Sequence, residues 1–282
     1  MSHLNQVPWW GAFHIAEGTC GKWEIGPSTL WLIHRSHEWA VVHRPSTDNE
    51  DMDHSISRSA YYVPASGNDC GDELTGTREG YQVRRYSFRD PQSDVSLTPA
   101  LADRPIVSRP ESTLFVPPHE SVTLYLSTPL WIQIRVTESG RQIAEMPSFR
   151  MSDTWFGPST IEGELCYATR TSGRLRRDDV PARLNRAITP LRVLNTGNDP
   201  LELVRVQLPA PYLALYKSDA DELWTEAVTM TRSDGVEGAE VEIVTGAPPE
   251  VRGASRITGP RQTLKKNLFT STFGAVGSLL ST

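Results

Sequence analysis

The chain contains 282 residues, of which 38% are hydrophobic, 8% aromatic and 22% charged, and its formal net charge at pH 7 is -6. This length favours two domains, since one domain typically takes about 150 residues. The eight tryptophans add enough apolar volume for a substantial core. The net negative charge argues against a nucleic-acid-binding protein, because such domains usually carry a basic excess.

The cysteines Cys20, Cys70 and Cys166 lie far apart and form no Cys-x-x-Cys unit. We therefore expect neither a disulfide framework nor a thiolate zinc site. The N-terminus lacks the basic start and apolar run of a signal peptide. No stretch approaches the about 20 apolar residues that span a bilayer. Together these features predict a soluble cytoplasmic protein.

Short apolar stretches separated by Gly, Pro and Asn turns run along most of the chain, a pattern typical of β-sandwiches and barrels. The apolar runs on either side of Arg35-Ser36 predict a hairpin with its tip at these two residues. His34 and His37 would then face each other across the strands. Residues 81–88 alternate in polarity, which predicts an edge strand.

A short motif recurs in the two halves of the chain. Gly-Pro-Ser-Thr followed by an aliphatic residue occurs at Gly26 and again at Gly157, and a tryptophan stands two or three residues before the glycine in each case. The spacing from Gly26 to Pro129 exceeds that from Gly157 to Pro211 by 49 residues, close to the length of a polar segment after residue 45. We interpret this as a possible internal duplication with one insertion.

The predicted fold class is therefore all-β, with two tandem β-sandwich-like domains and a short C-terminal amphipathic helix. The first domain covers residues 1–150, with a polar insertion at about 46–93, and the second covers 151–250. Residues 251–282 hold a basic segment and the helix.

Apolar residues near the C-terminus recur at helical spacing after a run of basic residues. An apolar stripe on a helix has to be buried, either on the chain's own domain, on a protein partner or on an anionic membrane surface. The candidate partner-binding residues are Leu264, Leu268, Phe269, Phe273 and Val276.

A cluster of arginines lies in the second half of the chain. Arg174, Arg176 and Arg177 are candidate anion-binding residues, because guanidinium groups bind phosphate and carboxylate in a bidentate manner. Asp178 and Asp179 lie inside the cluster, so pairing between these charges within one loop is the alternative.

Six of the seven histidines lie within the first 54 residues, and His34, His37, His43 and His54 are the closest candidates for a metal site. After His37-Glu38 the zincin pattern requires a histidine where Val41 stands. We expect surface and turn histidines, and we predict no metal or cofactor.

Aromatic residues on an exposed sheet face can stack against sugars, but core packing is the simpler role for large aromatics in β domains. The candidates are Trp9, Trp10, Trp23, Trp31, Trp39 and Trp131.

The common catalytic and nucleotide-binding motifs are absent. Ser28 and Ser159 follow Gly-Pro but lack the second glycine of the Gly-x-Ser-x-Gly elbow. There is no phosphate loop and no dinucleotide fingerprint. We predict no catalytic residue and a non-enzymatic binding or accessory module. The alternative is a metal- or carbohydrate-dependent enzyme with its site between the two domains, and homo-oligomerisation is left open.

Several phrases of the chain resemble an uncharacterised family, domain of unknown function 432. They are the opening at 23–27, Leu30-Trp31, Glu38-Trp39, and the pair of phrases at 190–193 and 200–203. The resemblance covers most of the chain and implies no activity, substrate or catalytic residue. Some relatives occur near mechanosensitive-channel proteins, which implies a further alternative, a cytosolic accessory of a membrane channel acting through the C-terminal helix.

Overall fold

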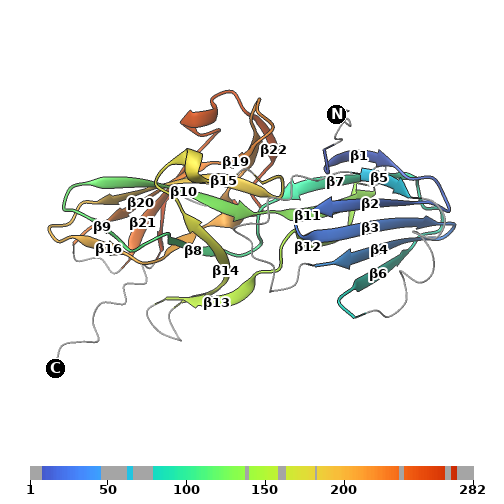
Figure 1. The fold of residues 1–282 in the computed structure, drawn as a ribbon, viewed down its shortest axis with the longest axis horizontal. Helices are drawn as coiled ribbons and strands as arrows, with labels where there is room; N and C mark the ends of the chain where they lie inside the picture. Colours follow the sequence, from blue (N-terminus) through green and yellow to red (C-terminus); the bar gives the residue numbers. More distant parts are fainter. Residues whose placement is uncertain are drawn as a thin grey trace. The chain divides into compact units, whose positions relative to one another are not determined.

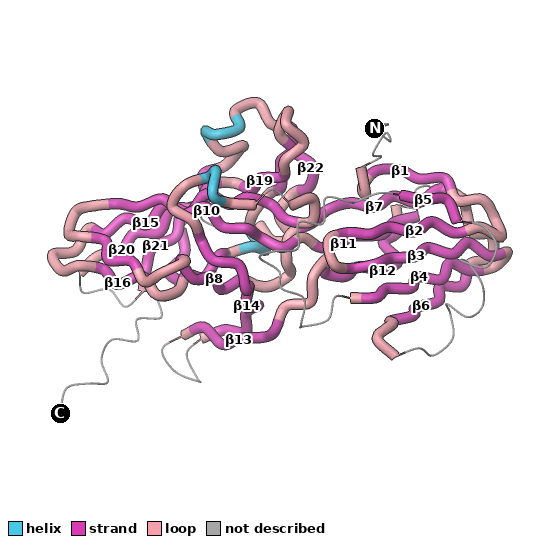
Figure 2. The backbone as a smooth tube through the Cα atoms, viewed as in Figure 1, coloured by secondary structure: helices cyan, strands magenta, loops and turns pink. Residues whose placement is uncertain are grey.

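The computed structural model describes residues 8–45, 62–65, 79–136, 140–157, 163–181, 183–234, 238–263 and 268–271. Almost all of its regular structure is β-strand, and the described helices are single 3-10 turns (Figure 1 and Figure 2). The many short apolar stretches between turn residues therefore form strands, which confirms the predicted all-β class.

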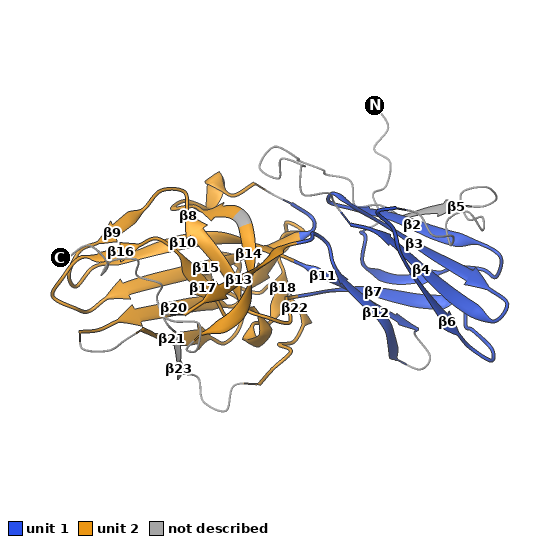
Figure 3. Cartoon of the chain, turned by 90° about the horizontal axis from the view of Figure 1, so that it is seen from below, with its two compact units in different colours: residues 1–100, 130–150, 183–185 blue, residues 101–129, 151–182, 186–282 orange. Residues whose placement is uncertain are grey.

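The chain forms two compact units, coloured separately in Figure 3. Unit 1 contains residues 1–100, 130–150 and 183–185, and unit 2 contains residues 101–129, 151–182 and 186–282. Each unit therefore combines segments that are separated in the sequence. The chain passes from one unit to the other at several points, and residue 150 is one of them.

Unit 1 contains two antiparallel sheets, of five and four strands. The five-stranded sheet has the order β5-β2-β3-β4-β6 and the four-stranded sheet has the order β1-β7-β11-β12. The strands are β1 (Gly11–His14), β2 (Cys20–Ile25), β3 (Ser28–Arg35), β4 (Glu38–Arg44), β5 (Tyr62–Ala65), β6 (Gln82–Ser87), β7 (Asp94–Ala100), β11 (Trp131–Val136) and β12 (Arg141–Pro147). Phe13 of β1 contacts Trp23 of β2 edge-to-face, with ring centroids 5.2 Å apart, so the sheets share a core.

Strand β3 occupies the middle of the five-stranded sheet and is buried along nearly its whole length. Its continuous apolar run suits a strand that is covered on both faces. On one face Trp31 and Ile33 pack with Ala40 and Val42 of β4. Strand β6 lies at the edge of the sheet, which confirms the edge strand predicted from the alternating sequence of residues 81–88.

The predicted hairpin between β3 and β4 is present, but its predicted tip and register are wrong. The tip is Ser36-His37, and His34 lies opposite Trp39 rather than His37. This register brings Arg35 opposite Glu38, where Nη1 lies 2.9 Å from Oε1. It also stacks the His34 ring on the Trp39 indole, with centroids 4.4 Å apart. These two contacts favour the observed register over the predicted one.

Unit 2 is built from one large sheet and two smaller ones. Its elements are β8 (Ile106–Pro110), β9 (Leu114–Val116), β10 (Ser121–Pro129), β13 (Ser152–Phe156), β14 (Glu164–Gly173), η3 (Arg177–Asp179), β15 (Arg186–Asn195), β16 (Leu201–Leu203), β17 (Val206–Leu208), η4 (Ala210–Tyr212), β18 (Leu215–Lys217), β19 (Leu223–Thr225), β20 (Ala227–Arg232), β21 (Ala239–Val244), η5 (Pro249–Val251), β22 (Ser255–Thr258) and β23 (Leu268–Ser271). The eight-stranded sheet has the order β22-β18-β19-β15-β20-β21-β23, with β10 also paired to β15. The smaller sheets are β13-β14-β8-β17 and β16-β9.

Strand β15 is hydrogen-bonded along both of its edges. On one edge β10 pairs with it antiparallel over nine successive residue pairs. On the other edge β19 and then β20 pair with it in parallel. Its alternating residues Leu191 and Val193 are fully buried. This strand therefore holds the large sheet of unit 2 together.

The predicted C-terminal amphipathic helix is wrong for the residues that the structure describes there. Leu268–Ser271 form strand β23, which pairs antiparallel with β21 and brings Phe269 opposite Val241. The edge of β21 presents backbone N–H and C=O groups that an extended segment can satisfy. The other predicted helix positions among the candidate partner-binding residues lie outside the described residues: Leu264, Phe273 and Val276.

The recurring Gly-Pro motif follows a strand in both places. Gly26 lies in the turn between β2 and β3, and Gly157 follows β13 in the connection to β14. The surroundings differ, because β3 pairs antiparallel with β4 whereas β14 pairs in parallel with β8. Pro129 ends a strand and Pro211 lies in η4. The two copies thus share a local turn signal but not a sheet arrangement.

We predict that Gly26→Ala destabilises unit 1 by about 2–4 kcal/mol, combining left-handed backbone strain with overpacking. Gly26 has φ +58°, and a Cβ there would lie 2.5 Å from Nδ2 of Asn185. Gly18→Ala is the matched control, because Gly18 has φ +76° but no atom within 4 Å of the added Cβ. Urea unfolding should show a loss of only about 1 kcal/mol for the control. Equal losses for the two variants would contradict the packing argument.

A second prediction concerns acid stability. Burial lowers the pKa of His43 to about 4, against a smaller opposing effect of Gln82. Between pH 6.5 and 4 the unfolded chain therefore binds a proton that the folded chain excludes, so stability falls as the pH is lowered through this range, by up to about 3 kcal/mol. In urea unfolding at pH 7, 5.5 and 4.5, His43→Gln should flatten this dependence and the exposed control His37→Gln should retain it. The same pH slope in His43→Gln and the parent chain would refute the assignment.

Candidate functional site

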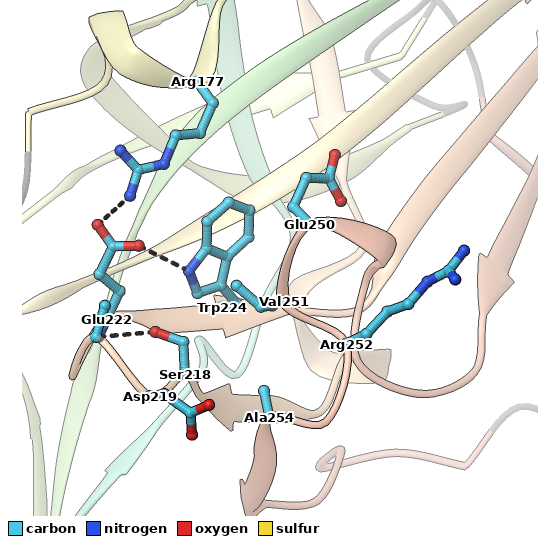
Figure 4. A pocket seen from close by; sticks show the side chains of 10 residues that line it. Arg177, Ser218, Asp219, Glu222, Trp224, Glu250, Val251, Arg252 and Ala254 are labelled. Atoms are coloured by element: carbon cyan, nitrogen blue, oxygen red, sulfur yellow. Dashed lines mark hydrogen bonds and ion pairs between the residues drawn. The ribbon is translucent and has the colours of Figure 1, made fainter.

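A pocket of about 590 Å³ lies within unit 2 (Figure 4). Its walls come from η3, from the turn between β18 and β19, from β19 itself, and from η5 and the turn that follows it. The lining residues are Arg177, Ser218, Asp219, Ala220, Glu222, Trp224, Glu250, Val251, Arg252 and Ala254. We call it the Trp224 pocket, because the buried indole of this residue forms part of its floor.

The floor of the Trp224 pocket is rigidly held. Trp224 lies on β19 and is 1% exposed. Its ring packs in a cluster with Val180 and Ile188, and Tyr125 and Val251 pack against the same cluster. Because these residues come from β10, β15, η5 and the segment after η3, several elements fix the orientation of the indole.

On one side of the indole, Arg177 and Glu222 form an ion pair (Figure 4). The Trp224 Nε1–H donates to the second carboxylate oxygen of Glu222 at 3.2 Å. The guanidinium carbon of Arg177 lies 5.9 Å from the centroid of the Trp224 ring. Hydrogen bonding to Glu222 is the main cause that raises the pKa of Arg177. Both charged groups are thus engaged by each other and by the indole.

On the other side of the indole, the Tyr125 hydroxyl donates to Glu250 at 3.0 Å. Burial, followed by the Glu250 carboxylate, raises the pKa of Tyr125. Asp219 and Arg252 are exposed, and within the described ranges neither forms an ion pair. The lining holds two arginines and three carboxylates, so one negative charge is in excess.

The three candidate anion-binding arginines have separate surroundings. Arg174 forms an ion pair with Glu111, whose pKa it lowers through a hydrogen bond. Arg176 is exposed and immediately precedes η3. Arg177 lines the Trp224 pocket and lies 3.6 Å from the Asp178 carboxylate in addition to its contact with Glu222. Anion binding by these residues stays a prediction from the sequence.

Most residues of the Trp224 pocket were not predicted from the sequence; Arg177 is the exception. Asp219 and Glu222 belong to an acidic turn that directly precedes the Trp224 strand, and Arg252 follows the Pro-rich segment ending at Pro249. An acidic turn beside a strand with one tryptophan was the available local signal. The approach of η5 to this turn depends on the pairing of β18 with β19 and β22, which local patterns do not encode.

The histidine candidates do not converge in the described part of the chain. His34 and His43 are buried and His37 is exposed, while His54 lies outside the described residues. Among the residues described, no group of three or more His, Cys, Asp or Glu side chains is placed to hold a metal ion.

The tryptophans proposed as sugar-stacking residues are nearly all in the core. Trp10 is half-buried. The remaining five are at most 8% exposed: Trp9, Trp23, Trp31, Trp39 and Trp131. Their indoles therefore fill unit 1, as the core-packing alternative predicted.

The cysteines differ from the expectation based on their spacing. Cys20 is disulfide-bonded, which the sequence argument did not anticipate. Cys166 is a free, buried thiol, and burial raises its pKa to about 11. A thiol with so high a pKa is almost entirely protonated at neutral pH and is a poor nucleophile.

The described residues include no helix that is both long and apolar enough to cross a bilayer.

Of the comparisons with known proteins, one gives a match. No curated protein matches the chain, and no solved structure does. Residues 9–277 match the family described as Protein of unknown function (DUF432). This match confirms the resemblance noted from the sequence. Since it covers nearly the whole chain, the protein belongs to the DUF432 family, whose function is unknown.

Proposed function

We propose that this chain is a non-enzymatic binding module, and that the Trp224 pocket takes a small molecule carrying both a positive and a negative group. The observation that carries the proposal is the pair Asp219 and Arg252, two opposite charges without ion-pair partners among the described residues, on the wall of one pocket.

The size and lining of the pocket suit a small ligand. Its volume of about 590 Å³ lies within the range of about 300–1,000 Å³ usual for ligand pockets. Val251 and Ala254 supply apolar surface, the buried Trp224 indole lies among the lining residues, and the charged groups stand around them (Figure 4). Such sites gain affinity from the apolar surface and orientation from a few polar groups.

The charges favour a zwitterion over an anion. Arg177 and Glu222 neutralise each other, so their ion pair adds no net charge. Arg252 is then the remaining cation and can bind a carboxylate in a bidentate manner. Asp219 and Glu250 offer carboxylate oxygens to an ammonium group. The excess negative charge repels a dianion such as phosphate, whereas an amino acid satisfies both signs.

The lining also favours binding over catalysis. Ser218 is the one hydroxyl among the residues that line the pocket, and no histidine is among them. The Ser218 oxygen accepts a hydrogen bond from the Glu222 backbone N–H at 3.2 Å. A serine nucleophile requires an adjacent general base, and Ser218 instead holds the turn that carries Glu222.

We predict that free amino acids raise the thermal unfolding midpoint of the full chain in a concentration-dependent manner, since a ligand of the native state stabilises it. Glycine, glutamate, arginine and glycine betaine form the test panel, and inorganic phosphate and maltose are the comparison ligands. Asp219→Asn and Arg252→Gln should each weaken binding about tenfold in calorimetry, because each removes one charged contact.

Glu240→Gln is the matched control, because Glu240 is exposed on β21 and lies outside the pocket lining. It should bind as the parent chain does. Binding of phosphate alone, or unchanged affinity in the Asp219→Asn, Arg252→Gln double variant, would refute the proposal.

Four further proposals rest on the sequence alone. They are partner or membrane contact through the tail, action as a channel accessory, homo-oligomerisation and a cytoplasmic location. One observation argues against a cytoplasmic location: Cys20 is disulfide-bonded, and disulfides are more common in proteins of oxidising compartments.

A further inference from the structure

Unit 1 holds two buried histidines on adjacent strands of its five-stranded sheet, His34 on β3 and His43 on β4. Both ring nitrogens of His34 face backbone carbonyl groups. Nδ1 lies 2.8 Å from the oxygen of Ile15, and Nε2 lies 3.2 Å from the oxygen of Pro91. The side chain is 2% exposed, so water does not replace either contact.

Carbonyl oxygens only accept hydrogen bonds, and a neutral imidazole carries a single N–H. Neutral His34 can therefore donate to one of its two carbonyl partners, and the other contact brings two lone pairs together. An imidazolium donates to both. We propose that His34 is a proton-operated clamp: its protonation ties Pro91 to strand β3, and its deprotonation releases that segment.

The segment concerned is residues 88–93, which we call the strap. It joins β6 to β7 and is held at three further points. Phe88 N–H donates to His37 O at 2.9 Å, and Ile15 N–H donates to Ser93 O at 2.8 Å. The Trp39 Nε1–H donates to Gln92 O at 3.2 Å. The contact to Pro91 is the longer of the two that His34 makes, so this contact is lost first when one proton leaves.

Among the described residues, no carboxylate is in contact with the His34 ring to balance the charge of an imidazolium. Charged residues on the segments around His34 are Glu17 in the β1–β2 connection, Arg89 and Asp90 in the strap, and Arg35 and Glu38 beside the β3–β4 turn. Glu17, Arg89 and Asp90 are exposed. Glu38 is bound by Arg35 and Arg85.

Beyond the strap, Asp94 is paired with His14 at 2.7 Å. Within the described residues, the His34 ring contacts the two carbonyl groups and the Trp39 indole, whose plane is inclined by 7° to its own. The indole face favours a cation.

His43 is the natural comparison, because it lies on the next strand and is equally buried. Among the described residues no backbone carbonyl lies within hydrogen-bond distance of its ring nitrogens, and the Gln82 side chain opposes the effect of burial only in part. Protonation of His43 therefore costs stability, whereas protonation of His34 adds a hydrogen bond. The two effects have opposite signs and are separated by substituting one histidine at a time.

The test is amide hydrogen exchange of the full chain by NMR at pH 5.5, 6.5, 7.5 and 8.0, corrected for the intrinsic pH dependence of exchange. Protection of the Phe88 and Ile15 amides, which anchor the two ends of the strap, should fall about fivefold as the pH rises, the equivalent of one lost hydrogen bond. His34→Gln should abolish this dependence, because glutamine does not titrate. His37→Gln, at an exposed position of the same hairpin, should retain it.

A second measurement does not depend on a variant that folds. In the ¹⁵N-labelled parent chain, the His34 ring should show two N–H signals at low pH and one at high pH, with the Nδ1–H retained because its contact is the shorter. A single ring N–H throughout this range would overturn the proposal. Equal pH dependence of strap protection in His34→Gln and the parent chain would also overturn it.

Discussion

The pairing of both edges of β15 is the constraint on which unit 2 depends. This strand carries β10 on one edge and β19 and β20 on the other, so every strand of the large sheet is placed relative to it. Tyr125 comes from β10, Ile188 from β15 and Trp224 from β19, and the three pack in one cluster. The floor of the Trp224 pocket is therefore a direct product of strand pairing.

The role of a charged group in or near the Trp224 pocket depends on whether it has a hydrogen-bond or ion-pair partner within the protein. Glu226 is buried and accepts hydrogen bonds from the backbone N–H groups of Ala214 and Gly246, so its carboxylate is structural. Glu222 is similarly engaged by Arg177 and Trp224. In the part of the chain that the structure describes, Asp219 and Arg252 have no such ion pair. The contrast separates residues that build the pocket from residues available to a ligand.

The same reasoning distinguishes the two buried histidines of unit 1. Both lie in the five-stranded sheet, and burial alone would treat them alike. Burial lowers the pKa of His43 to about 4, and the opposing hydrogen bond of Gln82 is the smaller effect. His34 meets two carbonyl acceptors and an indole face. The two histidines therefore differ in the acceptors around their rings, although both are buried.

The sequence by itself determined the all-β class, the family and several individual strands. Alternation over residues 81–88 was enough to predict the edge strand β6, because the side-chain period of a strand is local. The apolar runs on either side of residues 35–36 were likewise enough to predict that β3 and β4 form a hairpin. Tertiary structure decided what depends on partners distant in sequence: the Arg35–Glu38 register, the extended β23 that pairs with β21, and the Trp224 pocket. Helical spacing in the tail was misleading, because an unpaired sheet edge stabilises an extended segment regardless of its local period.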